Sequence, residues 1–139
     1  MASTFTIEIT TPERLLSREQ ATEAQIPIKD GYIGVLPDHA SLLSGLGAGV
    51  LSYVAADGKI HIMAIKGGFV EIDNNVVRVL GDVAEKGGEV DIAAAEKLLK
   101  EAQAALVNPA LGIDIASALI EAQHAQARVD AANGQAAQK

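Results

Sequence analysis

The sequence predicts a mainly β, α+β fold, with an N-terminal antiparallel β-sandwich of about ten short strands followed by a C-terminal αα-hairpin. The first observation is a change in composition near Val90, since 11 of the 13 glycines precede it and 16 of the 25 alanines follow it. The second is a change in hydrophobic period, from two residues before Val90 to alternating three- and four-residue steps after it. We therefore expect a β-sandwich domain over residues 1–88 and a helical hairpin over residues 89–139.

The strands are predicted by short runs in which apolar and polar residues alternate. In the first run Phe5, Ile7 and Ile9 share one face, as a half-buried strand requires. No helical pattern interrupts the runs, so a parallel sheet with crossover helices is not expected. Further runs cover residues 24–28, 32–36, 50–54, 60–65, 69–72 and 76–80, and turns are predicted at Asp30-Gly31, Asp57-Gly58, Gly67-Gly68 and Asp73-Asn74-Asn75.

Two helices are predicted after Val90. Asp91 and Asp114 can cap their first turns, and Asn108-Pro109 should end the first helix because the residue before proline avoids the α region. Both apolar faces are rich in alanine, which lets two helices approach closely in a hairpin. Such a hairpin must bury its apolar face on the sandwich or on another protein. These faces consist of Ile92, Ala95, Leu99, Ala102 and Leu106, and of Ile115, Ala118, Leu119, Ala122, Ala125 and Val129.

Composition excludes several classes of partner. The chain has 11 Lys and Arg residues against 18 Asp and Glu residues, a net charge of −7. Nucleic acids and anionic lipids attract basic surfaces, so we expect neither nucleic-acid binding nor direct lipid insertion. The absence of cysteine excludes disulfides, thiol nucleophiles and cysteine-ligated metals. The apolar runs are shorter than the ~20 residues that span a bilayer, and residues 1–11 lack the features of a secretory signal or transit peptide.

The sequence offers no convincing catalytic or cofactor-binding motif. The glycine cluster at residues 45–50 ends in valine where a dinucleotide fingerprint needs glycine, so a bend between strands is predicted. We expect no cofactor and no metal site, because the three histidines lack metal-ligand spacing, and we predict structural or solvated roles for them. Two carboxylate pairs could perform acid–base chemistry in a cleft, but we expect them to lie on a solvated face. The residues concerned are His39, His61 and His124, and the pairs Glu71/Asp73 and Asp82/Glu85.

Two segments of the predicted sandwich resemble a known family. One is residues 31–43, Gly-Tyr-Ile-Gly-Val-Leu-Pro-Asp-His-Ala-Ser-Leu-Leu, and the other runs from Gly67-Gly68-Phe69 through residues 75–80 to Ala84-Glu85. Followed by a helical hairpin, they resemble the epsilon subunit of the F-type ATP synthases. The resemblance implies a non-catalytic central-stalk subunit that links the gamma subunit to the c-ring, on the cytoplasmic side of the bacterial inner membrane. It also implies that the helices regulate ATP hydrolysis by reaching the alpha and beta subunits of the catalytic head.

The resemblance also assigns roles to residues of the sandwich. By position, Asp30, Tyr32 and His39 are the candidates for contact with the c-ring. Leu42 and Leu43 directly follow this segment, and we expect each either to pack on the core or to face the gamma subunit.

Two residues of the predicted hairpin are further candidates for binding a partner or a nucleotide. Arg128 is the single basic residue in the second helix, and the resemblance makes it the candidate contact with the catalytic head. Asp91 matches the acidic residue of an ATP-binding motif found in some relatives, but Ala94 replaces the arginine of that motif. Arginine supplies the donors that phosphate needs, so we expect weak or no ATP binding.

Two functions of other classes remain open at this stage. One is a free small-molecule-binding β-domain with a helical oligomerisation tail, and the other is an enzyme that uses a carboxylate pair. The fold alone does not decide between them, because sandwiches host many functions. Copurification with a gamma subunit discriminates, since only the central-stalk function requires it.

Overall fold

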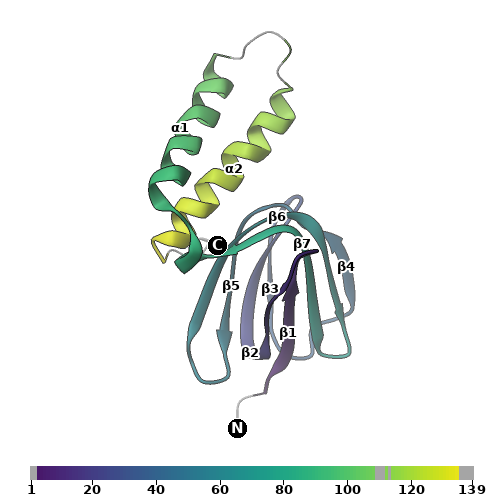
Figure 1. Cartoon of the computed structure of the whole chain (residues 1–139). Helices are drawn as coiled ribbons and strands as arrows, with labels where there is room; N and C mark the ends of the chain where they lie inside the picture. Colours follow the sequence, from purple (N-terminus) through teal and green to yellow (C-terminus); the bar gives the residue numbers. More distant parts are fainter. Residues whose placement is uncertain (1–2, 109–111, 113, 135–139) are drawn as a thin grey trace.

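A computed structural model describes residues 3–108, 112 and 114–134 and confirms the predicted fold class. Figure 1 shows a β-domain followed by two helices that project from one end of it. The strands are β1 (Phe5–Thr10), β2 (Leu15–Ile28), β3 (Gly31–Val35), β4 (Leu42–Gly45), β5 (Ala48–Ala55), β6 (Ile60–Asp73) and β7 (Val76–Lys86). A short 3-10 turn, η1 (Gly87–Glu89), leads to α1 (Ile92–Val107) and α2 (Ile115–Ala132).

The described residues contain seven strands, fewer than the ten expected, because β2 and β6 each run for 14 residues. The predicted turn at Gly67-Gly68 is wrong, since both glycines lie inside β6. Their backbones take φ values of 72° and 106°, which favour glycine, and the pairing of β6 with β7 is interrupted at Gly67 without a change of register. This irregularity lets β6 pair with β5 before it and with β4 after it. One long strand therefore occupies the positions for which two shorter strands were predicted.

The strands close into a flattened barrel. Their order is β1-β7-β6-β5-β2-β3, with β4 paired to β6, and β1 pairs with β2 as well as with β7. All pairs between named strands are antiparallel except β1 with β7, which is parallel. The prediction of an antiparallel sheet is therefore correct for every pair of named strands except one. The exception is β1 with β7, the first and last strands of the domain, whose parallel pairing closes the sheet.

The inward faces of the strands form one apolar core. The predicted alternation in β1 is confirmed, since Phe5, Ile7 and Ile9 are buried. The alternation of apolar and polar residues did not predict β4 or the first half of β2. The β2 segment carries charged residues and buries only Leu16 and Ala21 in that half, so its apolar signal is weak. The glycine cluster at residues 45–50 joins β4 to β5, as predicted.

Both predicted helix caps are confirmed. The Asp91 carboxylate accepts a hydrogen bond from the Ala94 amide at 3.1 Å, and the Asp114 carboxylate accepts one from the Ala116 amide at 3.0 Å. Helix α1 ends at Val107, and Pro109, which was expected to stop it, lies outside the described residues. No helix in the described part of the chain is long and apolar enough to cross a membrane.

Helix α2 packs on the sandwich, and α1 packs on α2. Residues near the end of α2 contact β5 and β6, and the opposite end of the hairpin projects away from the strands (Figure 1). Ile115 and Leu119, expected on the buried face of the second helix, are therefore largely exposed. Ala122 and Ala125, on the same predicted face, are buried. The prediction of that face holds where the helix reaches its neighbours and is wrong near its start.

Candidate partner-binding surfaces

The apolar contact between the hairpin and the sandwich is built from small side chains. Ala127 and Ala131 of α2 pack with Val50 of β5 and Ala64 of β6, and Ile62 is partly buried against them. Helix α2 also comes close to the backbone of η1, where a Cβ at Gly87 would lie 2.3 Å from the Ala131 carbonyl oxygen. Small residues bury little area each, so the apolar part of the docking free energy is modest.

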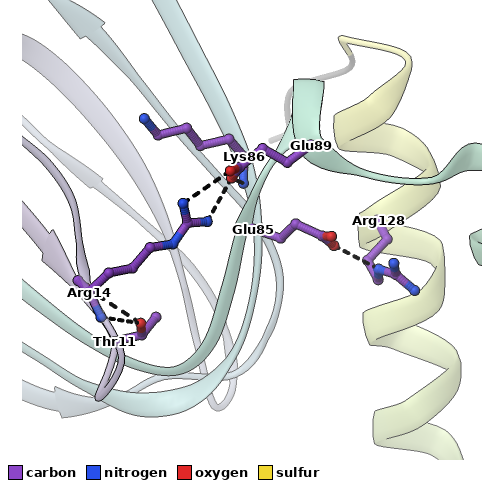
Figure 2. A network of polar contacts seen from close by, with 6 residues as sticks. All are labelled: Thr11, Arg14, Glu85, Lys86, Glu89 and Arg128. Atoms are coloured by element: carbon purple, nitrogen blue, oxygen red, sulfur yellow. Dashed lines mark hydrogen bonds and ion pairs between the residues drawn. The ribbon is translucent and has the colours of Figure 1, made fainter.

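Two ion pairs join α2 to the strands beside this contact. Arg128 Nε donates to Glu85 Oε1 of β7 at 2.8 Å (Figure 2), and Lys66 Nζ of β6 donates to Glu121 Oε1 of α2 at 3.0 Å. The Arg128 side chain is only 17% exposed. Sequence reasoning assigned Arg128 to the catalytic head and Glu85 to a solvated carboxylate pair. The structure pairs them instead, and their separation of 43 residues hid this contact from any local pattern.

A third ion pair links the start of the hairpin connection to the sandwich. Arg14, in the β1–β2 turn, donates to both carboxylate oxygens of Glu89 at 2.7 and 3.0 Å (Figure 2). The Glu89 carboxylate also accepts from the Lys86 amide at 3.1 Å. Hydrogen bonding to Arg14 lowers the pKa of Glu89, and hydrogen bonding to Glu89 raises the pKa of Arg14. The turn η1 is thereby tied to the sandwich, close to the predicted domain boundary at residue 88.

The three c-ring candidates do not lie together. Tyr32 lies at the start of β3, and its hydroxyl accepts a hydrogen bond from the Val50 amide at 3.0 Å. The Tyr32 side chain also lines a groove beside both helices. Asp30 is exposed in the adjacent turn. His39 follows the other end of β3 and is half-buried. The length of β3, at about 3.3 Å per residue, separates His39 from the other two.

The His39 segment is held by the turn between β6 and β7. The Asn75 side chain accepts a hydrogen bond from the Asp38 amide at 2.8 Å and donates one to the Thr4 carbonyl oxygen at 2.7 Å. The Ser41 hydroxyl donates to the Asp73 carboxylate at 3.1 Å. Three segments distant in sequence therefore meet at this end of the sandwich, which orders the loop over residues 36–41.

Leu42 and Leu43 have different environments. Leu42 packs against the core, whereas Leu43 is 70% exposed. Leu43 of β4 is paired with Glu71 of β6. Phe69 lies two residues before Glu71 in β6, so it is on the same face, and it is paired with Leu80 of β7. Phe69 is 59% and Leu80 is 53% exposed. We call Leu43, Phe69 and Leu80 the outer apolar patch, since residues paired across strands share one face of the sheet.

His61 belongs to a polar cluster that joins three strands. Its ring stacks on Tyr53 with centroids 4.8 Å apart, and its Nε2 lies 3.3 Å from a Glu19 carboxylate oxygen. The Tyr53 hydroxyl donates to Glu19 and lies 2.5 Å from the Ser17 hydroxyl. Burial raises the pKa of Tyr53, with a further contribution from Glu19, so the phenol stays protonated at neutral pH. These contacts fit the structural role expected for His61.

The nucleotide and metal interpretations gain no support from the geometry. The Asp91 carboxylate is engaged in capping α1, and Ala94 contributes only its backbone amide there. Among the residues described, no group of three or more His, Cys, Asp or Glu side chains could hold a metal ion. The outer apolar patch exposes large apolar side chains on one face of the sheet, which makes it a candidate surface for binding another protein.

Comparison with known proteins supports the resemblance seen in the sequence. A family model described as "ATP synthase, Delta/Epsilon chain, beta-sandwich domain" matches residues 4–87. The chain is 48% identical to the ATP synthase epsilon chain of Solibacter usitatus over 133 residues, covering 96% of this chain and 98% of that protein. It is 39% identical to the ATP synthase epsilon chain of Desulfitobacterium hafniense strain Y51 over 132 residues, covering 95% and 98%.

A solved structure has the same fold. A chain in the cryo-EM structure of the Euglena gracilis mitochondrial ATP synthase, OSCP/F1/c-ring, superposes with a TM-score of 0.78 at 23% identity. The match covers 94% of the present chain and 81% of that chain, so it includes the helical hairpin as well as the sandwich. The family model and the identities above show that the chain belongs to the ATP synthase epsilon chain family, whose members are non-catalytic subunits of that complex.

Proposed function

We propose that the chain is a central-stalk subunit of an F-type ATP synthase, in which the sandwich links the gamma subunit to the c-ring and the hairpin regulates ATP hydrolysis. Family membership supports an ATP synthase role, and the outer apolar patch supports the proposed contact with the gamma subunit. Three large apolar side chains exposed on one sheet face are costly in water and are suited to a permanent protein contact. The gamma subunit is the proposed occupant of this patch.

For the c-ring we propose a contact through the exposed turn between β2 and β3, which carries Asp30. The Tyr32 hydroxyl accepts a hydrogen bond from the Val50 amide, and Tyr32 lies beside the hairpin. The proposed role of Tyr32 is therefore to position this turn, without contacting the c-ring itself. His39 lies beyond the other end of β3 and would make a separate contact. Held by gamma and the c-ring, the subunit would be a peripheral protein on the cytoplasmic side of the bacterial inner membrane.

The proposed regulation rests on the modest docking of α2. The alanine-rich contact buries little apolar area, and the more exposed Lys66–Glu121 pair contributes about 0–1 kcal/mol. The partly buried Arg128–Glu85 pair gains a hydrogen bond, but this gain is offset by the desolvation of both charges, so the net docking free energy is small. Two positions of the hairpin, docked and extended toward the alpha and beta subunits, can then be close in free energy. No nucleotide is proposed for the hairpin, because Asp91 caps α1 and Ala94 offers no side-chain donor.

Substitution of Leu42 and Leu43 tests the gamma contact. Leu42→Ala should lower the free energy of unfolding by about 2 kcal/mol because Leu42 packs on the core. Leu43→Ala should leave the unfolding free energy unchanged and weaken binding to the gamma subunit about tenfold. Thermal melting and copurification with gamma measure the two effects. Ile60→Ala, which removes a similarly exposed side chain at the far end of β6, is the control and should change neither.

Unchanged gamma binding after Leu43→Ala and Phe69→Ala together would reject the outer apolar patch as the gamma contact. Failure of the unaltered chain to copurify with gamma would reject the central-stalk function itself. In that case the small-molecule-binding β-domain would become the better account.

A further inference from the structure

We propose that His124 makes docking of the hairpin sensitive to pH, so that uptake of a proton by its imidazole weakens the docked state and favours release. The inference rests on the proposed function, because it names a signal that would regulate the same hairpin. It is carried by the position of this one side chain in the docked interface.

His124 lies on the face of α2 that meets the strands. It follows Glu121 by three residues and precedes Arg128 by four, and both of those side chains are bonded to the sandwich. Its Nε2 atom is buried and has no hydrogen-bond partner among the described residues. Protonation would place an N–H donor and a positive charge at this atom without an acceptor. Such a group costs free energy only while the hairpin is docked, because water supplies an acceptor after release.

None of the carboxylates around His124 is hydrogen-bonded to its buried Nε2 atom. The two nearby carboxylates are already paired, Glu121 with Lys66 and Glu85 with Arg128, so the four charges sum to zero. Glu101 of α1 and Asp114 at the start of α2 line the same groove between the helices. Burial lowers the pKa of His124 most, Lys66 and Arg128 lower it further, and Glu121 and Glu85 oppose this shift.

The direction of the pH effect follows from linkage. In the released hairpin His124 should titrate near the ordinary pKa of 6.5, and in the docked hairpin it titrates lower. Docking is therefore fully favourable above pH 6.5 and weakens as the pH falls below it. Until the pH reaches the lower, docked pKa, each pH unit of acidification should reduce the docking equilibrium constant about tenfold. The released state then binds one more proton than the docked state.

The absence of native cysteine allows a direct measurement on the full chain. A cysteine introduced by Ala127→Cys lies in the docked contact, whereas one introduced by Ala116→Cys is exposed on the same helix. Each cysteine is labelled with a disulfide reagent, and the labelling rate of Ala127→Cys is divided by that of Ala116→Cys. This ratio reports the opening of the contact, and it cancels the pH dependence of thiol reactivity. We expect this ratio to rise from about pH 7.5 to about pH 5.5, across the histidine titration, at constant ionic strength. Ala131→Cys provides a second buried position if Ala127→Cys disturbs docking.

The variant His124→Gln should make the ratio independent of pH. His39→Gln, which changes a half-buried histidine in a loop of the sandwich outside the hairpin contact, should leave the response intact. A flat ratio in the chain that keeps His124, or an equal slope after His124→Gln, would overturn the inference. Only the isolated chain is used, so either result leaves the gamma contact untouched. Conversely, loss of gamma binding leaves this pH response in place, and the two proposals therefore fail separately.

Discussion

Ala127→Leu should release the hairpin while the sandwich stays folded. Ala127 is buried against Val50 and Ala64, and this contact is separate from the main core of the sandwich. Three extra carbons have no space there, and overpacking of this kind costs about 1–3 kcal/mol. That cost corresponds to a roughly 5- to 150-fold fall in the docking equilibrium constant.

Limited proteolysis of α2 and thermal melting of the sandwich measure the two parts of this prediction. Cleavage within α2 should accelerate strongly in the variant, and the melting of the sandwich should not change. Ala116→Leu places the same side chain on an exposed position of α2 and should leave the cleavage rate as it is. If cleavage is equally slow in both variants, then the alanine contact does not hold the hairpin.

Gly68→Ala should destabilise the sandwich more than any substitution on its surface. Gly68 has a φ of 106°, and a Cβ there would lie 1.9 Å from the Leu80 carbonyl oxygen. An L-residue would have to change this backbone conformation and push β7 away, at the point where β6 changes partner. We expect a loss of about 3–5 kcal/mol in the free energy of unfolding, the range typical of strain combined with a backbone clash.

Urea unfolding gives this free energy directly. Gly34→Ala is the matched control, because a Cβ at Gly34 meets no atom within 4 Å and its backbone is not in the left-handed region. It should change the free energy of unfolding by less than about 1 kcal/mol. A loss that small in Gly68→Ala as well would mean that β6 does not need its glycine irregularity.

Local patterns predicted the elements whose cause is local. The alternation of Phe5, Ile7 and Ile9 identified β1, and the carboxylates of Asp91 and Asp114 identified the starts of both helices, because a strand face and a helix cap depend on residues close in sequence. The change of hydrophobic period near Val90 predicted the sandwich and the hairpin, and the resemblance of residues 31–43 and 67–85 to a family agreed with that fold.

Features that depend on distant contacts could not be predicted in this way. Gly67-Gly68 has the composition of a turn, but strands on both sides hold it inside β6. Arg128 looked like a free cation until the fold placed it beside Glu85. Leu43 and Leu42 are the same residue type in consecutive positions, and only the pairing of β4 with β6 decides which one faces outward.

Ion pumping and ATP hydrolysis by the assembled synthase test the central-stalk role most directly. The complex is measured without the chain, with the full chain, and with a chain that ends at Val107, each at low and high salt. The proposed function predicts that pumping needs the sandwich and survives the deletion of α2. It also predicts that hydrolysis rises only modestly on deletion, since Arg128 is the single Lys or Arg residue of α2 and exposed charge contacts contribute little. Pumping that is equally efficient without the chain would contradict the role of the sandwich, and a large, salt-sensitive rise in hydrolysis would contradict the weak electrostatic contribution of α2.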